Sequence, residues 1–368
     1  MKFALFYEIP VARPWSAGAE HRAYKNVIEQ AELGDRLGFH SFWTVEHHFL
    51  EEFSHCSNPE VLYGALAMKT ERLRLGYGVR LMPKPYNHPV RSAESAAVLD
   101  LLSDGRVEFG SGRSATREEL EGFGVNPHET RAMWREALQH IVGCWTNDVH
   151  EFAGEYWQMP KRRVLPKPVQ DPHPPIWGAT TSIDGHEEMG RNGVGVCSFT
   201  VGVPPEDLVE RVEAYRKGLA QCDQPIGKFR NERVATFTMA HCADSNRQAY
   251  DEARASMEWY PSKGVSLFKD AARWMESLSE EGLGTYSYMS AAKEIPDVAV
   301  PFDYIKDSGA ALVGDPDRCV EIARRYEAAG CDLLLCLVNP YDIPHPAVMR
   351  SIELIGKHVI PELDPDAR

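Results

Sequence analysis

The sequence lacks several patterns that would place it in a common class of protein. Its eight cysteines include no C-x-x-C pair, which argues against a disulfide framework or a zinc ribbon and is typical of free thiols in a reducing compartment. No apolar stretch approaches the roughly 20 residues needed to span a bilayer. The opening MKFALFYEIP has too short an apolar run for a signal peptide, and it lacks a cleavage-site pattern. We therefore expect a cytoplasmic protein that does not enter membranes.

Positive charge is also scarce. The 368 residues carry 40 Lys and Arg against 54 Asp and Glu, a net charge of −14. This balance argues against a general surface for nucleic acid or anionic lipid. An anionic cofactor would need a local patch of arginines or backbone N–H groups. The hydrophobic fraction of 43% is ordinary for a globular protein with a sizeable core.

What the sequence does contain is an alternation of short apolar runs with amphipathic helical patterns, which indicates parallel βα units. The strand-like runs number eight: 2–7, 41–45, 73–82, 106–110, 175–179, 194–199, 233–240 and 332–338. Helical patterns lie between most of them: 20–37, 58–70, 90–102, 126–145, 315–329 and 346–359. We predict a single α/β domain, 1–368, folded as a (β/α)8 TIM barrel with insertions. A doubly wound open sheet is the alternative.

Two segments interrupt this alternation. Segment 154–175 is rich in proline, and we interpret it as an irregular excursion that wraps the barrel. Segment 261–311 is richer in glycine, serine and lysine. An insertion of that length in an α/β fold is usually a binding loop or a lid, so we predict a lid there.

The first candidate site is the pair His47 and His48, which follows the second strand. Chemistry in a TIM barrel takes place on the loops after the strands, and imidazole acts as an acid or a base near neutral pH. We expect one ring to point into the site and the other to brace it, although two hydrogen-bonded polar residues at a strand end would look the same. His55 and Cys56 lie nearby, but adjacent histidines lack metal-ligand spacing and we find no second cluster. We expect no metal.

Two further strand ends could together bind a phosphate. Segment 109–116 contains Arg113 among small residues, and an arginine fork suits phosphate oxygens. Segment 176–182 ends with Ser182 at the start of a helix, where hydroxyl and N–H groups bind anions. The G-S-G-R fragment lacks the third glycine of a dinucleotide-binding motif, and a plain tight loop remains the alternative.

The third strand holds Gly76 and Gly78, which either allow a flat aromatic ring to lie against the backbone or relieve crowding inside the barrel. Aromatic residues are frequent near the expected strand ends. They suggest an apolar or aromatic substrate, or they pack the barrel mouth: Phe6, Tyr7, Trp43, Tyr77, Trp177 and Phe199.

Taken in order, these pieces resemble the bacterial-luciferase-like flavin monooxygenases over nearly the whole chain. The resemblance is carried by the opening M-K-F, E-H-H-F followed by N-P, L-G-x-x-V-x-L-x-P followed by H-P-V-R, S-D-G-R, P-P-I, T-S and V-G-D-P. It implies a TIM barrel, usually dimeric, that binds FMN or a deazaflavin at the strand ends.

The resemblance also implies roles for individual residues. His47 matches the histidine associated with catalysis and His48 its neighbour, while Gly78 and Val79 match a dipeptide joined by a cis peptide bond beside the flavin ring. The phosphate contacts would be Arg113 and Ser182, with the N–H groups of Gly185 and His186 in addition. Departures from luciferase, at Tyr77 and Arg80 in the flavin wall, at Gly112 and at Thr181, argue against light emission.

From these observations we expect reduced FMN, supplied by a separate NAD(P)H:flavin reductase, to react with O2 and oxygenate a small organic substrate. Three alternatives stay open at this point. They are a deazaflavin-dependent reductase or dehydrogenase on the same fold, a metal-dependent barrel hydrolase, and a flavin-binding protein without catalytic activity.

Overall fold

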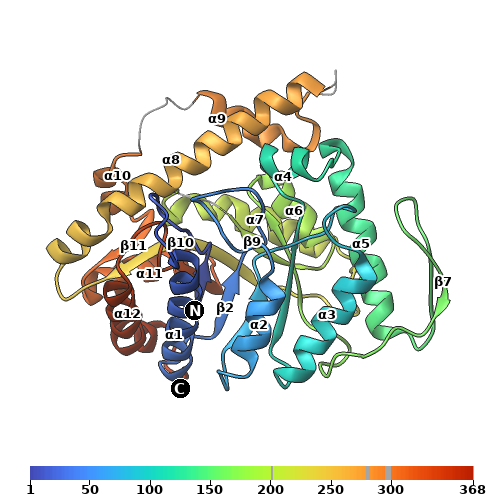
Figure 1. Ribbon diagram of the computed structural model, residues 1–368, viewed down its shortest axis with the longest axis horizontal. Helices are drawn as coiled ribbons and strands as arrows, with labels where there is room; N and C mark the ends of the chain where they lie inside the picture. Colours follow the sequence, from blue (N-terminus) through green and yellow to red (C-terminus); the bar gives the residue numbers. More distant parts are fainter. Residues whose placement is uncertain (200–201, 279–281, 295–299, 368) are drawn as a thin grey trace.

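The computed structural model describes residues 1–199, 202–278, 282–294 and 300–367. Within these ranges a closed ring of parallel strands forms a barrel, as the sequence predicts (Figure 1). Its eight positions in order are β1 Lys2–Tyr7, β2 Ser41–Thr44, β3 Arg74–Tyr77, β5 Val107–Gly112, β8 Ile176–Thr180, β9 Gly195–Ser198, β10 Val234–Cys242 and β12 Leu333–Leu337. The ring closes at β1, where Ala4 pairs with Ser41 on one side and with Leu335 on the other.

Two short strands lie beside this ring. Strand β4 (Arg80–Leu81) continues the line of β3 and pairs with β5. Strand β11 (Ala311–Gly314) pairs with the last four residues of β10, and only the first of these, Met239, also pairs with β12. All nine residues of β10 are buried. Strands buried on both faces read as continuous apolar runs, which is why the sequence indicates them so clearly.

Helices surround the barrel and connect its strands. Those of the barrel layer are α1 Ala19–Arg36, α2 Pro59–Ala67, α3 Pro89–Leu102, α5 Thr130–Thr146, α6 Ile183–Arg191, α7 Leu208–Ala220, α11 Pro316–Ala328, α12 His345–Leu354 and α13 Ile360–Leu363. Short 3-10 helices lie at η1 Pro127–Glu129, η2 Pro205–Asp207 and η3 Gly284–Met289, and a π-helical segment lies at η4 Ile355–Val359. Within the described part of the chain, no helix combines the length and the apolar character needed to cross a membrane.

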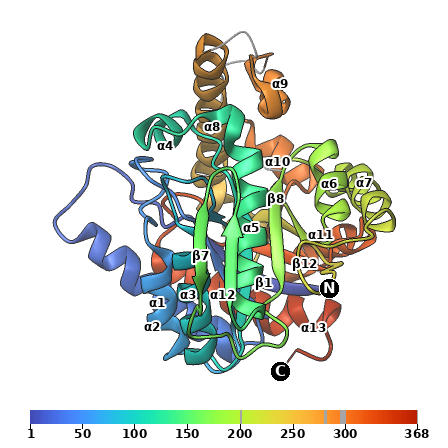
Figure 2. The ribbon, with the colours of Figure 1, turned by 90° about the vertical axis from the view of Figure 1, so that its right-hand side faces the viewer.

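The remaining helices cover one end of the barrel: α4 Arg117–Gly122, α8 Asn246–Leu278, α9 Ser290–Glu294 and α10 Phe302–Ser308. Figures 1 and 2 show α8 and α9 above the barrel, next to α4. Side chains from α4, α8 and η3 share a small apolar core of their own that includes Leu120, Met275 and Tyr286. The inserted segment is therefore packed on the barrel end, and its residues 279–281 and 295–299 lie outside the described ranges.

The predicted start of this insertion, at about residue 261, lies inside helix α8. Helix α8 runs through Pro261 without a break. Proline removes one backbone donor from a helix, and here the Ser262 hydroxyl donates to the carbonyl of Glu258, 2.5 Å away, in the same turn. The first half of α8 buries Ala253 and Met257 against the barrel, so tertiary packing holds the helix together across the proline.

The interpretation of segment 154–175 as wholly irregular also needs correction. Strand β7 (Gln158–Arg162) pairs antiparallel with β6 (His150–Ala153) and forms a hairpin beside α5 (Figure 2). Pro160 lies within β7. Proline is tolerated on such an edge strand, because the N–H groups along its unpaired edge make no hydrogen bonds to another strand. The hairpin is anchored by Glu136 of α5, whose carboxylate accepts three backbone N–H groups from residues 155–157.

Candidate active site

His47, in the loop after β2, lies between two buried carboxylates, Glu8 at the end of β1 and Glu119 in the first turn of α4. Its Nδ1 is 2.9 Å from Glu119 Oε1, and its Nε2 is 3.6 Å from Glu8 Oε2. The Tyr260 hydroxyl donates to the other oxygen of Glu8 at 2.8 Å. Glu8 Oε2 itself has no hydrogen-bond partner among the described residues. Nδ1 of the imidazole is therefore held by Glu119. Nε2 points at a Glu8 oxygen that can still accept a hydrogen bond.

This arrangement sets the charge of the ring. Burial alone would lower the pKa of His47, but the charges of Glu119 and Glu8 outweigh it and raise the pKa to about 9. Burial raises the pKa of Glu8 in spite of the opposing effect of His47. For Glu119, contact with His47 and hydrogen bonds from two hydroxyls outweigh burial and lower the pKa. At neutral pH His47 is thus a protonated acid paired with the Glu119 carboxylate.

Glu119 was not singled out by the sequence analysis, although it organises the site. Its side chain is fully buried and accepts from His47 Nδ1, from the His48 backbone N–H, and from the hydroxyls of Ser114 and Thr116. Thr116 is the N-cap of α4, and Glu119 stands three residues later. This T-x-x-E spacing is a helix-start signal, and it was the only hint in the sequence.

His48 occupies a different environment from His47. Its Nε2 lies 3.5 Å from Glu46 Oε1, and its ring contacts Tyr86 and Phe123 at centroid distances of 6.1 and 4.9 Å. Glu46 is held in turn by Asn87 and by the backbone N–H of residue 81. The two adjacent histidines therefore face different groups, as expected for extended backbone.

The Gly78–Val79 peptide bond is cis, as the resemblance implies. It lies against the second strand, because the Gly78 N–H donates to Thr44 and the Val79 carbonyl accepts from the N–H of Glu46. A Cβ at Gly78 would come within 2.9 Å of the Phe6 ring. The chain thus keeps this position free of a side chain, directly beside the residue that precedes His47.

Other parts of the third strand serve packing. A Cβ at Gly76 would be 2.2 Å from the indole of Trp43, so this glycine relieves crowding inside the barrel. Tyr77 is fully buried against Tyr63 of α2. Arg80 donates to Ser92 of α3 and to Glu60 of α2. The interpretation of Tyr77 and Arg80 as part of a flavin wall is wrong, because both side chains point at the helix layer.

Arg113 and the start of α6 line one small cavity, together with Arg131, Thr180 and Gly185. Arg131, which the sequence analysis missed, is 3.4 Å from Glu188 and brings a second positive charge to this place. A Cβ at Gly185 would be 1.9 Å from the Thr180 hydroxyl oxygen, so the glycine keeps the cavity wall close to the backbone. Two arginines near a helix N-terminus suit an anion, and Glu188, which lines the same cavity, balances the charge of Arg131.

The first turn of α6 is held by hydrogen bonds within the protein. The Ser182 hydroxyl accepts from the Gly185 N–H at 3.1 Å, and the His186 N–H donates to the Ser182 carbonyl. The imidazole of His186 is buried and bonded to Ser182 and Ser198. Both backbone N–H groups that we assigned to a phosphate therefore have partners inside the protein. The Ser182 hydroxyl keeps its own proton free to donate.

The inserted segment reaches Arg113 directly. Arg113 donates to the hydroxyl of Thr285 at 2.8 Å, and its guanidinium carbon lies 4.6 Å from the ring centroid of Tyr286. The Tyr286 hydroxyl contacts Thr130 Oγ1 at 2.9 Å and donates to the carbonyl of Ser114 at 3.0 Å. The lid thus closes on the candidate anion site through η3.

An aromatic wall adjoins His47. Successive rings contact one another with centroid distances of 5.0 to 6.2 Å, in the order Phe53, Tyr260, Phe237, Phe6 and Phe199. His47 joins this row through Phe53 at 6.1 Å. Trp43 and Trp177, by contrast, are fully buried against each other in the barrel interior. Only part of the aromatic set named from the sequence therefore borders the site.

Comparison with known proteins agrees with this geometry. The sequence model of a family described as luciferase-like monooxygenase matches residues 1–333. The oxygenase component of flavin-dependent trigonelline monooxygenase from Acinetobacter baylyi is 30% identical over 338 residues, which cover 90% of this chain and 87% of that protein.

Two solved structures are similar along their whole length. The monooxygenase RslO1 from Streptomyces bottropensis has a TM-score of 0.76 and 26% identity, covering 99% of this chain and 100% of its own. The oxygenating constituent of 3,6-diketocamphane monooxygenase from Pseudomonas putida, in complex with FMN, has a TM-score of 0.77, 21% identity and 98% coverage of both chains.

The fold and the strand-end site therefore define a TIM-barrel oxidoreductase. The chain belongs to the luciferase-like monooxygenase family, and its general reaction is that of a monooxygenase.

Proposed function

We propose that the protein uses reduced FMN and O2 to oxygenate a small apolar or aromatic molecule. The observation that carries this proposal is the placement of the partly exposed His47 between Glu8 and Glu119, whose charges raise its pKa, one residue after the backbone that contacts the Gly78–Val79 cis peptide.

The residues at the strand ends fit FMN. Arg113 and Arg131 face the N-terminus of α6 across a cavity whose wall at Gly185 tolerates no Cβ. This is the donor set that a phosphate group needs. Ser182 would add its hydroxyl, and the N–H groups of Gly185 and His186 would contribute through the dipole of the helix. The ring would lie beside Gly78 and Val79, as the resemblance implies.

The bound flavin would supply the oxygen-activating chemistry, and the protein would manage protons. His47 holds a proton on Nε2, which faces Glu8 Oε2 at 3.6 Å. Glu119 fixes the opposite nitrogen and stabilises the cationic form. An imidazolium held in this way can donate a proton to an oxygen that becomes negative and then recover it through Glu8. We assign His47 as the acid and His48 as its supporting neighbour.

The lid and the aromatic wall would supply the dry environment that oxygen chemistry needs. Contacts of Thr285 and Tyr286 with Arg113 close the insertion over the phosphate end of the site, which excludes water. The row of rings from Phe53 to Phe199, most of which are buried, makes the side of the site next to His47 apolar. This apolar side is the reason for proposing an apolar or aromatic compound.

We also propose how the enzyme receives its flavin and how it assembles. A separate NAD(P)H:flavin reductase would deliver the reduced FMN, because the sequence contains no second nucleotide-binding motif. We propose a single catalytic domain over 1–368 and, from the resemblance, a cytoplasmic homodimer. Light scattering of the purified protein would test the oligomeric state.

The direct test is an anaerobic fluorescence titration with FMN, reduced FMN and the deazaflavin coenzyme in parallel. The proposal predicts micromolar or tighter binding of reduced FMN, about −8 kcal/mol, and weak binding of the deazaflavin. Tight binding of the deazaflavin alone would instead favour a hydride-transferring enzyme. Binding of none of the three would contradict the assignment of Arg113 and Ser182.

A second experiment separates an enzyme from a flavin carrier. The protein, a flavin reductase, NADH and O2 are incubated with a panel of small apolar and aromatic compounds. An oxygenated product that contains one atom of labelled oxygen from O2 supports the monooxygenase. Tight binding of reduced FMN without any product from the panel would favour the carrier.

A further inference from the structure

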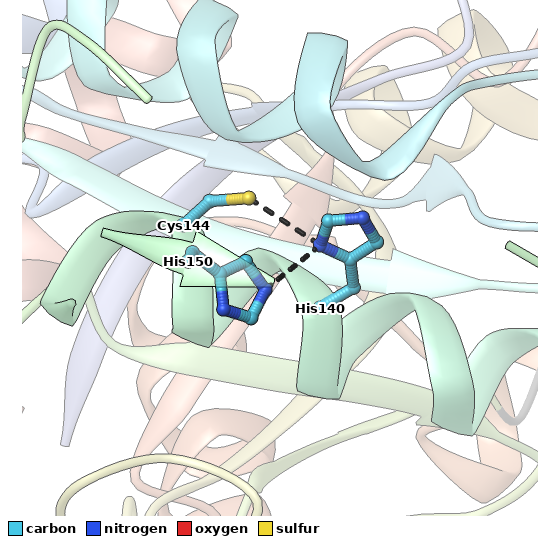
Figure 3. A group of neighbouring side chains, drawn as sticks. All are labelled: His140, Cys144 and His150. Atoms are coloured by element: carbon cyan, nitrogen blue, oxygen red, sulfur yellow. Dashed lines mark hydrogen bonds between the residues drawn. The ribbon is translucent and has the colours of Figure 1, made fainter. Parts of the chain in front are cut away.

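A second group of histidine and cysteine side chains lies outside the barrel, where α5 meets the first residue of β6 (Figure 3). His140 Nδ1 is 3.4 Å from Cys144 Sγ and 3.1 Å from His150 Nε2. The three ligand-type atoms all lie within 4.8 Å of one another. The side chains are almost completely buried, with exposed fractions of 0%, 1% and 7%.

The local structure explains this convergence. His140 and Cys144 are four residues apart on one face of α5, and the chain then turns back so that His150 faces them. Gly143 makes room for this ring, because a Cβ there would be 2.2 Å from His150 Cε1. The sequence analysis found no second metal-type cluster, and it overlooked this H-x3-C-x5-H spacing.

Hydrogen bonding alone does not satisfy the cluster. Nδ1 of His140 is approached by both the Cys144 sulfur and His150 Nε2, but a neutral ring nitrogen offers either one lone pair or one proton. It can make one good hydrogen bond to these two neighbours. Its other nitrogen, Nε2, is buried without a hydrogen-bond partner among the described residues. A cation between the three atoms would use the lone pairs of all of them at once.

The charge states are compatible with metal binding. Burial lowers the pKa of His140 to about 4 and also lowers that of His150, so both rings are neutral ligands at pH 7. Burial raises the pKa of the Cys144 thiol to about 12, and a bound metal would have to displace this proton. The charged groups that act on the thiol are Lys167, which favours the thiolate, and Glu94, which opposes it.

We propose that His140 Nδ1, Cys144 Sγ and His150 Nε2 bind one Zn²⁺ ion. Neutral imidazole nitrogens and a thiolate are its usual ligands, and the two separations from His140 Nδ1, 3.4 and 3.1 Å, are close to the edges of a zinc-centred tetrahedron. A water molecule completes the fourth position. Binding releases the Cys144 proton to solvent, and it leaves His150 Nδ1 protonated next to the Asn147 amide, 3.4 Å away, whose oxygen can turn to accept.

The zinc site would be structural. It lies at α5 and β6, outside the barrel, whereas His47 lies at the end of β2. Of the four residues of β6, His150 is the buried one, and β7 is mostly exposed. A two-stranded hairpin is marginal without further contacts. A zinc ion at its base would fasten the hairpin to α5, next to the anchor that Glu136 provides at its other end.

The test uses the full chain, purified without added metal and then stripped with a chelator. Titration with Co²⁺, a spectroscopic substitute for zinc, should give one ion per chain and a thiolate-to-cobalt charge-transfer absorption band. Added Zn²⁺ should abolish the band by competition and raise the melting temperature. Fewer than one cobalt ion per chain, or one ion without the band, would overturn the proposal.

Variants assign the site to these residues. Cys144→Ala and His150→Gln should lose the band and the response of the melting temperature to zinc. Cys222→Ala, which removes a free cysteine elsewhere, should retain both. The melting temperature of each variant without metal shows whether it has folded. A band that survives in folded Cys144→Ala, or one that is lost in Cys222→Ala, would contradict the assignment.

Discussion

His47 Nδ1 lies 2.9 Å from Glu119 Oε1, although the two residues are 72 positions apart in the chain. The contact joins the loop after β2 to the first turn of α4. It places a buried carboxylate where it keeps the imidazole protonated up to a pH of about 9. This pair is the proton-handling part of the proposed reaction.

Replacing His47 with alanine should lower turnover without weakening flavin binding, because the ring acts in proton transfer and the phosphate is held elsewhere. Acid–base catalysis by a positioned side chain accounts for roughly 100- to 10,000-fold in rate, and we expect a loss in that range. Steady-state kinetics with a substrate from the oxygenation panel, and anaerobic titration with reduced FMN, measure the two effects. His21→Ala, on the exposed surface of α1, is the control. Normal turnover of His47→Ala would remove the histidine from the mechanism.

Replacing Glu119 with glutamine should shift the alkaline limb of the pH profile. The wild-type kcat/KM should stay level up to pH 8 and fall as His47 loses its proton near pH 9. Loss of the Glu119 charge lowers the pKa of His47, so the fall should begin at lower pH. Glu8→Gln should move it in the same direction by less, since Glu119 has the larger effect. NMR titration of the His47 ring gives an independent value; an unchanged midpoint in Glu119→Gln would contradict the pairing.

Removing the Tyr286 hydroxyl should loosen the lid. Tyr286→Phe loses contacts to Thr130 and Ser114, each contributing about 1 kcal/mol. Because the lid closes on Arg113, reduced FMN should leave roughly 10- to 30-fold faster. Stopped-flow fluorescence under anaerobic conditions measures this rate. The same change at Tyr304, a half-exposed residue of α10, should have no effect; equal release rates in both variants would argue against a lid at this place.

Two glycine substitutions should have opposite effects on stability. A Cβ at Gly110 would be 1.8 Å from the backbone carbonyl oxygen of Tyr77, which cannot move aside, so Gly110→Ala should destabilise the barrel by about 1–3 kcal/mol or more. At Gly64, in α2, a Cβ would meet no atom within 4 Å, and alanine should stabilise the helix by about 0.5–1 kcal/mol. Denaturant unfolding measures both changes. A neutral Gly110→Ala would mean that β3 and β5 are farther apart than described.

The sequence was informative where one local pattern decides the structure. Strands buried on both faces appear as apolar runs, and from these runs we predicted the barrel. The rule that active sites of TIM barrels lie at the strand ends then pointed to His47 and Arg113. It was less informative where contacts come from distant segments. Glu119 and Arg131 reach the site only because the helices after β5, α4 and α5, begin beside it, and neither residue stands out in its own neighbourhood of the chain.

Two features of secondary structure at prolines were not predicted. Pro160 concealed strand β7, although an edge strand tolerates it, and the continuation of one helix through Pro261 was not foreseen. In both places the deciding contribution is tertiary: pairing with β6 in one case, and burial of α8 on the barrel in the other. Local propensity cannot report either of these contacts.

The most direct test of the account compares reduced FMN with reduced riboflavin, which lacks the phosphate. Anaerobic titrations of the wild type should show tighter binding of reduced FMN by roughly 10-fold or more, in line with about 1.5–3 kcal/mol for charged hydrogen bonds. In Arg113→Ala this preference should shrink several-fold, to the part that Arg131 and the start of α6 contribute, and reduced riboflavin should lose less affinity than reduced FMN. An undiminished preference for FMN in the variant would contradict the placement of the phosphate between Arg113 and α6, and with it the site proposed for the flavin.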